Sequence, residues 1–479
     1  MAGLCGLAHP MKWSALARGL GLVLSLACHP AATPGTGSAK EAGTSFLTLQ
    51  HGTLINPGAR PIPEANVVVR DGHIACAGTA TACPRPPGSK AIDVGGGYVG
   101  PGLIDAHVHY SQTGWVDGRP DAIDLRAQYP YDSVIRSLEA HPELFHRANL
   151  CSGVTSVFDV GGFPWTYGLA RRTRAATDAP RVVATGPLLA TITVDSQMMG
   201  QFVFMQDDST VRAAVRAHRA AGAEAVKVWY IEVPDSLRAH AKAMLMAAAD
   251  ETRKAGLRLV VHATELHSAK DAVEAGAAVL VHEVFSDTVD TAFLAAVKRA
   301  GTIVIPTLTV LDGYADVFLG RSPAKRYPLE CVDPATRRKL ETILPDSLRA
   351  KGAAFWGGPG AALRSTAAGN LRRMYEAGIP IAMGTDAGNP GTAHGPGVYA
   401  EMEAMQQAGM PARAVFESAT IVAARAMALD KEVGSVEAGK RADLVVFDAD
   451  PTTDIGNARQ VHFVVHNGVL YNRQDLLPR

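Results

Sequence analysis

The sequence predicts an α/β fold: a (β/α)8 TIM barrel with a small β-sandwich domain formed by both chain ends. Between residues 99 and 432, short runs rich in Val and Ile alternate with amphipathic helical patterns, which is typical of a parallel sheet covered by helices. The flanking segments, residues 46–98 and 433–479, instead carry short β-type runs separated by turn signals such as Asp71-Gly72 and Asn467-Gly468. Two end segments of the same character predict one small domain built from both.

Eight apolar runs supply the predicted barrel strands, the number that closes a barrel of this type. Helical spacing of Val211, Val215 and His218, ended by Gly222, predicts one of the intervening helices. After the seventh run we expect an insertion at about residues 312–360, forming a long, irregular, lid-like loop at the barrel mouth. The eight runs lie at residues 101–109, 154–160, 181–185, 225–229, 257–262, 278–282, 302–307 and 380–384.

Length and charge exclude some classes of function. The chain has 479 residues, 47% of them hydrophobic, which suits one large barrel plus an accessory domain. Lys and Arg number 46, as do Asp and Glu, so the formal net charge is zero. This balance, without a long basic run, argues against a nucleic-acid partner. We expect a small-molecule partner, and a homo-oligomer stays open.

The N-terminus carries the features of an export signal. Lys12 and Arg18 precede an apolar stretch at residues 19–27, which is too short to span a bilayer. We therefore expect a signal peptide over residues 1–28 and a flexible linker, rich in Ala, Pro, Gly, Thr and Ser, over residues 29–45. Ala27-Cys28 is similar to a bacterial lipoprotein cleavage site, although Ser25 departs from that pattern.

Two locations follow from this signal. A lipid anchor on Cys28 would give a membrane-anchored lipoprotein, and an ordinary cleaved signal peptide would give a free periplasmic protein. Export permits disulfides among the Cys residues of the mature chain. Cys76 and Cys83 could bridge a hairpin, but we favour free, partly buried thiols. No Cys has metal-finger spacing, so a metal site must use His and carboxylates. The mature chain keeps Cys76, Cys83, Cys151 and Cys331.

Several of the apolar runs end in residues that suit a metal site. His107 and His109 are two apart in a strand, so their imidazoles point to the same side. Nitrogen and oxygen ligands at the ends of several barrel strands are how such enzymes hold a hydrolytic metal. Taken singly, each His could be structural, and Asp386 could cap a helix. The complete set, in barrel order, is His107, His109, Lys227, His262, His282 and Asp386.

The motifs around these residues resemble those of the amidohydrolase superfamily, in its imidazolonepropionase-like and prolidase-like group. The likeness extends from about residue 46 onward and implies a metal-dependent hydrolase barrel. The matching motifs are Pro-Gly-Leu-Ile-Asp-Ala-His-Val-His at 101–109, Val-Val-His at 260–262, Leu-Val-His at 280–282, Gly-Thr-Asp at 384–386 and Glu-Ala-Gly-Lys-Arg-Ala-Asp-Leu-Val at 437–445.

Lys227 decides the subtype, because an ammonium has no lone pair for a cation. If Lys227 faces the site it must be modified, and the resemblance to the binuclear branch implies a carboxylated lysine that bridges two divalent metal ions, with zinc the expected metal. The alternative is a structural lysine that pairs with a carboxylate elsewhere. The resemblance further implies that His107, His109 and Asp386 bind one ion, and that His262 and His282 bind the other.

The resemblance implies an amidohydrolase that cleaves a C–N bond, amide or peptide, by attack of a metal-bridging hydroxide, with Asp386 as the catalytic base. Exported members with the lysine resemble dipeptidases of the Xaa-Pro type. Tyr230 and His394 are the predicted substrate contacts, and Trp115 and Arg119 are weaker candidates. Two alternatives stay open: a mononuclear cyclic amidohydrolase or deaminase, and a non-catalytic binding protein on the same scaffold.

Overall fold

The computed structural model describes residues 46–478, apart from the side chains of residues 196, 197 and 199. The predicted signal peptide, at residues 1–28, and the predicted linker, at residues 29–45, lie outside the described residues. Among the helices that the structure does describe, none is long and apolar enough to cross a membrane.

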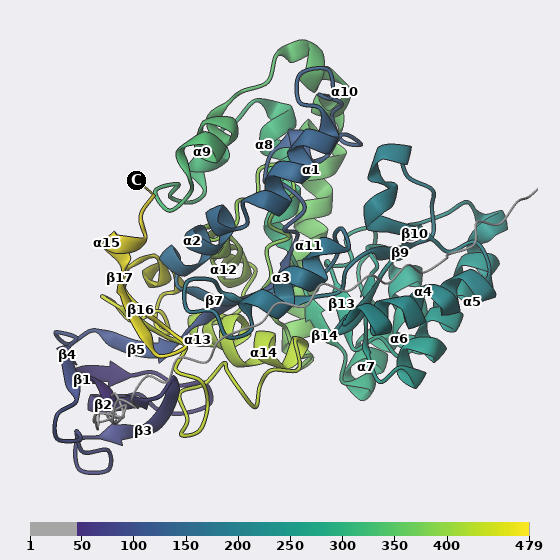
Figure 1. The fold of residues 1–479 in the computed structure, drawn as a ribbon. Helices are drawn as coiled ribbons and strands as arrows, with labels where there is room; N and C mark the ends of the chain where they lie inside the picture. Colours follow the sequence, from purple (N-terminus) through teal and green to yellow (C-terminus); the bar gives the residue numbers. More distant parts are fainter. Residues whose placement is uncertain (1–45, 479) are drawn as a thin grey trace, which may run out of the picture. The chain divides into compact units, whose positions relative to one another are not determined.

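Strands from both ends of the chain form one eight-stranded sheet. Its order is β17-β16-β15-β5-β1-β2-β3, with β4 paired to β1. The two ends meet at β5, which runs parallel to β1 and antiparallel to β15. Figure 1 shows the purple N-terminal strands beside the yellow strands β16 and β17. The strands are β1 (Phe46–Leu54), β2 (Ile62–Arg70), β3 (His73–Thr79), β4 (Lys90–Asp93), β5 (Tyr98–Pro101), β15 (Leu444–Phe447), β16 (Val461–His466) and β17 (Val469–Asn472).

The barrel is built from parallel strands of the middle of the chain. One sheet joins β6, β7 and β8, and a second joins β10, β9, β11, β12, β13 and β14 in that order. The two sheets meet where β9 follows β8 in the sequence. There Glu224 N, just before β11, donates to the carbonyl of Ala184, the last residue of β8, at 3.4 Å. The strands are β6 (Leu103–Val108), β7 (Val154–Asp159), β8 (Arg181–Ala184), β9 (Leu188–Ala190), β10 (Phe202–Phe204), β11 (Ala225–Trp229), β12 (Arg258–His262), β13 (Val279–Val281) and β14 (Ile303–Ile305).

The eighth barrel position is held by an extended segment, residues 380–387, and not by the continuous strand that the sequence predicts. On one side Ala382 N donates to Val304 O at 2.9 Å, and on the other Ala106 N donates to Met383 O at 3.0 Å. The segment therefore lies between β14 and β6. Its ladder is broken because Pro380 has no N–H and Asp386 adopts a left-handed backbone, with φ of 62°.

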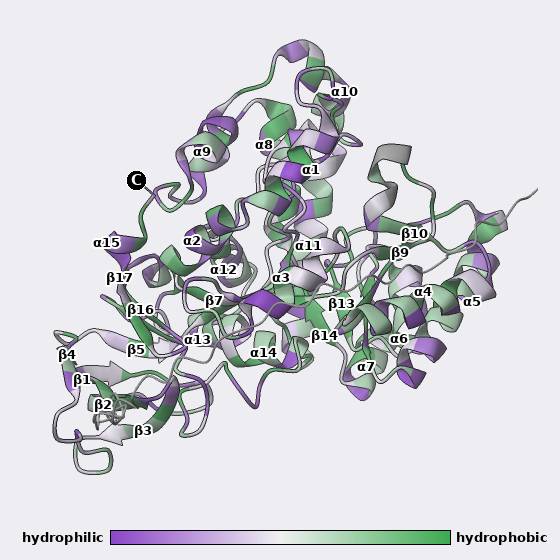
Figure 2. Cartoon of the chain, viewed as in Figure 1, coloured by the Kyte–Doolittle hydropathy of each residue, from purple (hydrophilic) through white to green (hydrophobic). Residues whose placement is uncertain are grey.

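Helices surround these strands. The predicted helix at residues 211–218 is confirmed as part of α4, in which Val211, Val215 and His218 are buried and Gly222 forms a left-handed C-cap. Figure 2 shows apolar strands such as β13 and β14 beside helices α6 and α7, whose surfaces include polar residues. The helices are α1 (Tyr131–Ala140), α2 (Glu143–Cys151), α3 (Trp165–Thr173), α4 (Asp208–Ala221), α5 (Asp235–Lys254), α6 (Leu266–Glu274), α7 (Thr291–Ala300), α12 (Gly397–Gln407), α13 (Ala412–Glu417), α14 (Ala423–Ala426) and α15 (Arg473–Leu476).

The insertion after β14 is helical, so the prediction of an irregular loop at residues 312–360 was wrong. Its proline residues start helices: Pro334 and Pro359 occupy first turns, and the Asp333 side chain caps α9. An apolar cluster that includes Val317, Phe318 and Trp115 holds the insertion against the loop that follows β6. The insertion comprises α8 (Leu308–Leu319), α9 (Pro334–Glu341), α10 (Asp346–Gly357) and α11 (Pro359–Glu376).

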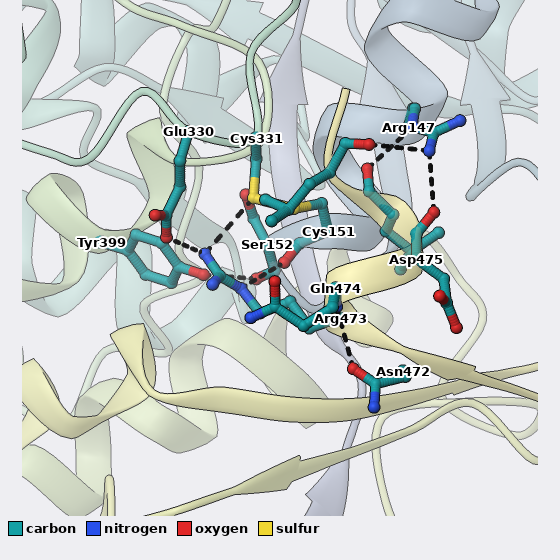
Figure 3. The surroundings of a disulfide bond; sticks show 12 residues. Arg147, Cys151, Ser152, Glu330, Cys331, Tyr399, Asn472, Arg473, Gln474 and Asp475 are labelled. Atoms are coloured by element: carbon teal, nitrogen blue, oxygen red, sulfur yellow. Dashed lines mark hydrogen bonds and ion pairs between the residues drawn. A yellow bond between two sulfur atoms is a disulfide. The ribbon is translucent and has the colours of Figure 1, made fainter. Parts of the chain in front are cut away.

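Two disulfides join the four described cysteines, so the preference for free thiols was also wrong. Cys76 and Cys83 are neighbours at the end of β3, and Cys151 pairs with Cys331 across 180 residues of sequence. The second bond ties the insertion to α2. Figure 3 shows Arg473 beside it, donating to Cys151 O at 3.2 Å and pairing with the Glu330 carboxylate. The C-terminal helix α15, α2 and the insertion are thus fastened at one place.

We expect the Cys151–Cys331 bond to contribute more to stability than the Cys76–Cys83 bond. A longer closed loop loses more entropy in the unfolded chain, which gives about 5 kcal/mol for a 180-residue loop and about 2 kcal/mol for a 7-residue loop. Urea unfolding of the oxidised Cys151→Ser/Cys331→Ser variant, with Cys76→Ser/Cys83→Ser as the matched control, measures both losses. Equal losses would contradict the prediction.

Candidate metal centre

The structure brings all six predicted ligands to the wall of one cavity, of about 330 Å³. Each lies at the C-terminal end of a barrel element, where the parallel strands of such a barrel converge on its active face. His107 and His109 come from β6, Lys227 from β11 and His262 from β12. His282 follows β13, and Asp386 belongs to the eighth segment.

Asp386 contacts both histidines of the first strand. Its Oδ1 lies 3.2 Å from His107 Nε2 and 3.0 Å from His109 Nε2, and these two nitrogens are 3.3 Å apart. His109 Nδ1 lies 2.7 Å from Gly161 O, and a carbonyl can only accept, so Nδ1 carries the proton. The lone pair of His109 is therefore on Nε2, facing Asp386. A fixed tautomer of this kind is what a metal-binding imidazole requires.

His262 and His282 complete the cluster. Their ring centroids are 4.4 Å apart, and the His282 ring centroid is 4.9 Å from that of His107. The His282 ring is oriented by Thr307, whose Oγ1 lies 2.7 Å from Nδ1. Ligand atoms of His107, His282 and Asp386 all lie within 4.8 Å of one another. Three distant parts of the chain thus present donor atoms to one small volume.

Three residues at this end of the barrel hold a left-handed backbone without being glycine. They are His282, Thr307 and Asp386, with φ of 72°, 48° and 62°. Such a conformation costs on the order of 1–3 kcal/mol per residue and persists only where the surroundings enforce it. At each position the strand turns sharply at its end. The strain is concentrated where side chains must be aimed into the cavity.

The charge states of the cluster suit metal ligands. Burial lowers the pKa of His107 to about 3, and it lowers the pKa values of His262 and His282 well below their usual value. These imidazoles are therefore neutral and keep a lone pair. Burial alone would raise the pKa of Asp386, but its contact with His107 holds this pKa well below the usual value. Neutral imidazoles around an ionised carboxylate form a donor set that fits a divalent cation.

Lys227 is buried among these ligands, with 1% of its surface exposed. No hydrogen bond or ion pair to another residue of the segment 46–478 involves its Nζ. Burial lowers the pKa of Lys227 to about 7, although Asp386 partly opposes this. An amine with this pKa is about half neutral at pH 7, and its neutral form is a nucleophile.

A second layer of residues holds the predicted metal ligands in place, and one part of it is Asp105. Its Oδ1 accepts from Thr385 N at 2.9 Å and from His107 N at 3.2 Å, while Oδ2 accepts from Thr385 Oγ1 at 2.6 Å. These bonds join β6 to the eighth segment beside His107. Sequence reasoning assigned Asp105 no role, although an acidic residue on the same strand face as His107 was a signal.

Asn389 and Glu401 belong to the same layer. Asn389 Nδ2 donates to Asp386 Oδ1 at 2.8 Å, while Asn389 Oδ1 accepts from Tyr314 Oη at 3.0 Å and from Arg119. The Glu401 carboxylate accepts from the backbone N–H groups of residues 308 and 309, both at 2.8 Å, and so fixes the chain next to Thr307. Both were missed, because their partners are distant in sequence.

The two predicted substrate contacts do not lie at the cavity wall. Tyr230 Oη donates to Asp271 Oδ2 at 3.2 Å, because alternation along the strand end turns Trp229 to the cavity and Tyr230 away from it. His394 is buried and stacked on Phe145, with ring centroids 4.0 Å apart. Arg119, a weaker candidate, does line the cavity.

We expect Gly384→Ala to impair metal binding. A Cβ at position 384 would lie 2.8 Å from His107 N and Cβ and 2.6 Å from Ile305 Cγ2, closer than packed atoms allow. Overpacking of this kind costs about 1–3 kcal/mol and would displace His107. Bound metal per chain, measured by plasma mass spectrometry after zinc reconstitution and desalting, should fall.

Gly369→Ala in α11 is the matched control, because a Cβ there meets no atom within 4 Å. This variant should keep its metal and gain slightly in stability, since Ala is the better helix former. Full metal content in Gly384→Ala would show that the first strand tolerates displacement.

Comparison with known proteins places this geometry in a family. The family model for the amidohydrolase family matches residues 98–470. An imidazolonepropionase from Rhizorhabdus wittichii is 26% identical over 440 residues, which cover 84% of this chain and 92% of that protein. An imidazolonepropionase from Caulobacter vibrioides is 27% identical over 430 residues, covering 81% and 90%.

Solved structures show the same fold. A Xaa-Pro dipeptidase with bound methionine superimposes with a TM-score of 0.67 at 22% identity, covering 89% of this chain and 100% of the other. The match with the family model spans most of the sequence and includes every element that bears a predicted ligand. The chain therefore belongs to the amidohydrolase family and is a hydrolase acting on C–N bonds.

Proposed function

We propose that the protein hydrolyses the C–N bond of an amide or peptide, with two divalent ions and with Asp386 as the group that moves the proton. The observation that carries this proposal is the position of the Asp386 carboxylate, within 3.2 Å of the Nε2 atoms of His107 and His109 on the wall of the cavity. His107, His109 and Asp386 would hold one ion, and His262 and His282 would hold the other.

The proposal includes carboxylation of Lys227 by CO2. The amine is buried, about half neutral at pH 7 and without a hydrogen-bond or ion-pair partner among the described residues, so its neutral form can attack CO2 and lose a proton. The resulting carbamate would offer two oxygens to the ions and would place a negative charge among the ligands. When bound, the ions, most simply zinc, acidify water and polarise the substrate carbonyl.

The residues of the chain then carry out the proton transfers. Asp386, ionised at neutral pH, takes a proton from the attacking water and returns it to the leaving nitrogen, which makes expulsion of the amine feasible. Asn389 orients the carboxylate through its 2.8 Å hydrogen bond to Oδ1. The amide of Asn389 cannot flip without loss, because its own oxygen accepts from Tyr314 and Arg119.

Peptides that end in proline are one candidate substrate class, supported by the fold shared with a Xaa-Pro dipeptidase. A mononuclear deaminase or cyclic amidohydrolase with a structural Lys227 is the competing proposal, and the missing partner for Lys227 counts against it. We also propose that the chain is exported, either as a periplasmic protein or anchored by a lipid on Cys28. The two disulfides support export, because such bonds persist in oxidising compartments.

Asp386→Asn should lose most activity and keep part of its metal. An amide cannot take a proton from water, and general-base catalysis contributes about 10²–10⁴-fold in rate. Turnover of dipeptides and N-acyl amino acids by zinc-reconstituted protein, alongside metal content, measures both effects. Asp235→Asn on the exposed surface of α5 is the control and should behave like wild type. Wild-type turnover in Asp386→Asn would remove the proton-transfer role.

Lys227→Ala should lose bound metal and regain part of it with a short carboxylic acid such as acetate or propionate. The added carboxylate would take the place of the carbamate oxygens in the space left by the side chain. Metal analysis should give near two ions per chain for wild type and fewer for the variant. Lys242→Ala, which removes a surface ion pair with Glu274, is the control. Full metal content in Lys227→Ala, or one ion in wild type, would favour the mononuclear proposal.

A further inference from the structure

The wall of the cavity is divided into two parts. Most polar lining side chains gather around the predicted metal ligands, and most of the remaining wall is apolar; the other polar lining residues are Gln112, Arg119, Thr264 and Asn389. Tyr314 and Trp356 stand out, because their rings are stacked with centroids 5.7 Å apart and planes within 8° of parallel. Both come from the helical insertion, from α8 and α10.

This aromatic pair lies close to the reaction centre. Tyr314 Oη donates to Asn389 Oδ1 at 3.0 Å, and Asn389 Nδ2 donates to Asp386 Oδ1 at 2.8 Å. Two hydrogen bonds therefore separate the Tyr314 ring from the proposed proton carrier. A substrate whose C–N bond lies at Asp386 would have its distal group within reach of the pair.

A buried apolar cluster supports the Tyr314–Trp356 pair. Tyr314 and Trp356 pack against the buried apolar cluster that contains Phe318, Leu344 and Trp115. The cluster spans the insertion and the loop after β6. Side chains with such support lose little conformational entropy when a ligand binds, which favours a preformed subsite.

The charged group nearest to the aromatic pair, the Arg119 guanidinium, already has partners in the protein. The Arg119 guanidinium binds Asp121 in a two-pronged contact, with Nε–Oδ1 at 2.9 Å and Nη2–Oδ2 at 2.7 Å. Its Nη1 donates to Asn389. Among the described lining residues, the other side chains that carry charge are Lys227 and Asp386, at the metal ligands. A charged substrate group beside Tyr314 would lose water without gaining a partner, which is costly.

We infer that Tyr314 and Trp356 form a subsite for an uncharged aromatic ring of the substrate, so that the preferred substrates are amides with an aryl or arylalkyl group. The inference rests on the proposed amide hydrolysis and adds the substrate class. Offset or edge-to-face contact of a ring with this pair adds to the gain from burying the ring. The cavity, at about 330 Å³, lies within the range of small-molecule sites.

Paired substrates test the inference on both sides of the scissile bond. N-benzoylglycine against N-acetylglycine places the ring on the acyl side, and N-acetylphenylalanine against N-acetylalanine places it on the amine side. We expect the zinc-reconstituted wild type to prefer the ring-bearing member of at least one pair by about tenfold or more in kcat/KM. Trp356→Ala should abolish that preference and leave the ringless substrates within about twofold.

Two further variants distinguish the effect of the Trp356 ring from an effect of the surrounding structure. Trp356→Phe keeps an aromatic face and should retain much of the preference. Ile343→Ala is the matched control, because Ile343 belongs to the same insertion, is 57% exposed and does not line the cavity. Its kinetics should equal those of wild type. An equal loss on ringed and ringless substrates in Trp356→Ala, or no ring preference in wild type, would overturn the subsite.

Direct binding keeps the subsite testable if no amide is hydrolysed. Calorimetric titration of metal-loaded wild type should give at least tenfold tighter binding of N-benzylacetamide than of N-methylacetamide, and Trp356→Ala should remove the difference. If this holds while no amide is cleaved, the proposed function fails and the subsite stands. Equal binding of the two amides, or tighter binding of the cation benzylammonium than of N-benzylacetamide, would overturn the subsite.

Discussion

The contact of the Asp386 carboxylate with His107 and His109 is the constraint on which the site depends. A buried carboxylate is unfavourable unless hydrogen bonds or cations offset its lost hydration. Here the first strand and the eighth segment must keep the register that places Asp386 Oδ1 3.2 Å from His107 Nε2 and 3.0 Å from His109 Nε2. Asp105 secures that register through Thr385, and Gly384 permits the close approach. The geometry of the candidate metal centre thus depends on how one strand and one irregular segment meet.

The left-handed residues at the strand ends explain why so much hydrogen bonding surrounds the site. His282, Thr307 and Asp386 occupy conformations that isolated chains avoid. Glu401 binds the backbone directly after Thr307, and Thr307 in turn orients the His282 ring. Burial raises the pKa of Glu401 to about 7, so this support sits close to its own protonation range. Stabilising interactions elsewhere in the barrel must offset the strain.

The helical insertion carries the proposed substrate subsite and is anchored to the barrel. It is fastened by the Cys151–Cys331 bond and Arg473 at one end, and by the cluster around Phe318 near the cavity. Between these anchors it presents Tyr314 and Trp356 to the substrate. Barrel enzymes commonly vary the loops at the strand ends while the barrel itself is retained. In this chain the variable element is helical and cross-linked, which suits a rigid wall better than a mobile cover.

The sequence by itself determined the barrel, the sheet formed from both ends and the six predicted ligands that meet at one cavity, because these follow from local periodicity and from motifs a few residues long. Tertiary structure alone decided the helical form of the insertion, the cysteine pairing and the positions of Tyr230 and His394 away from the cavity. It also decided the roles of Asn389, Glu401 and the Tyr314–Trp356 pair. Each of these depends on contacts between residues far apart in sequence, and no local pattern encodes which distant surface a side chain will meet.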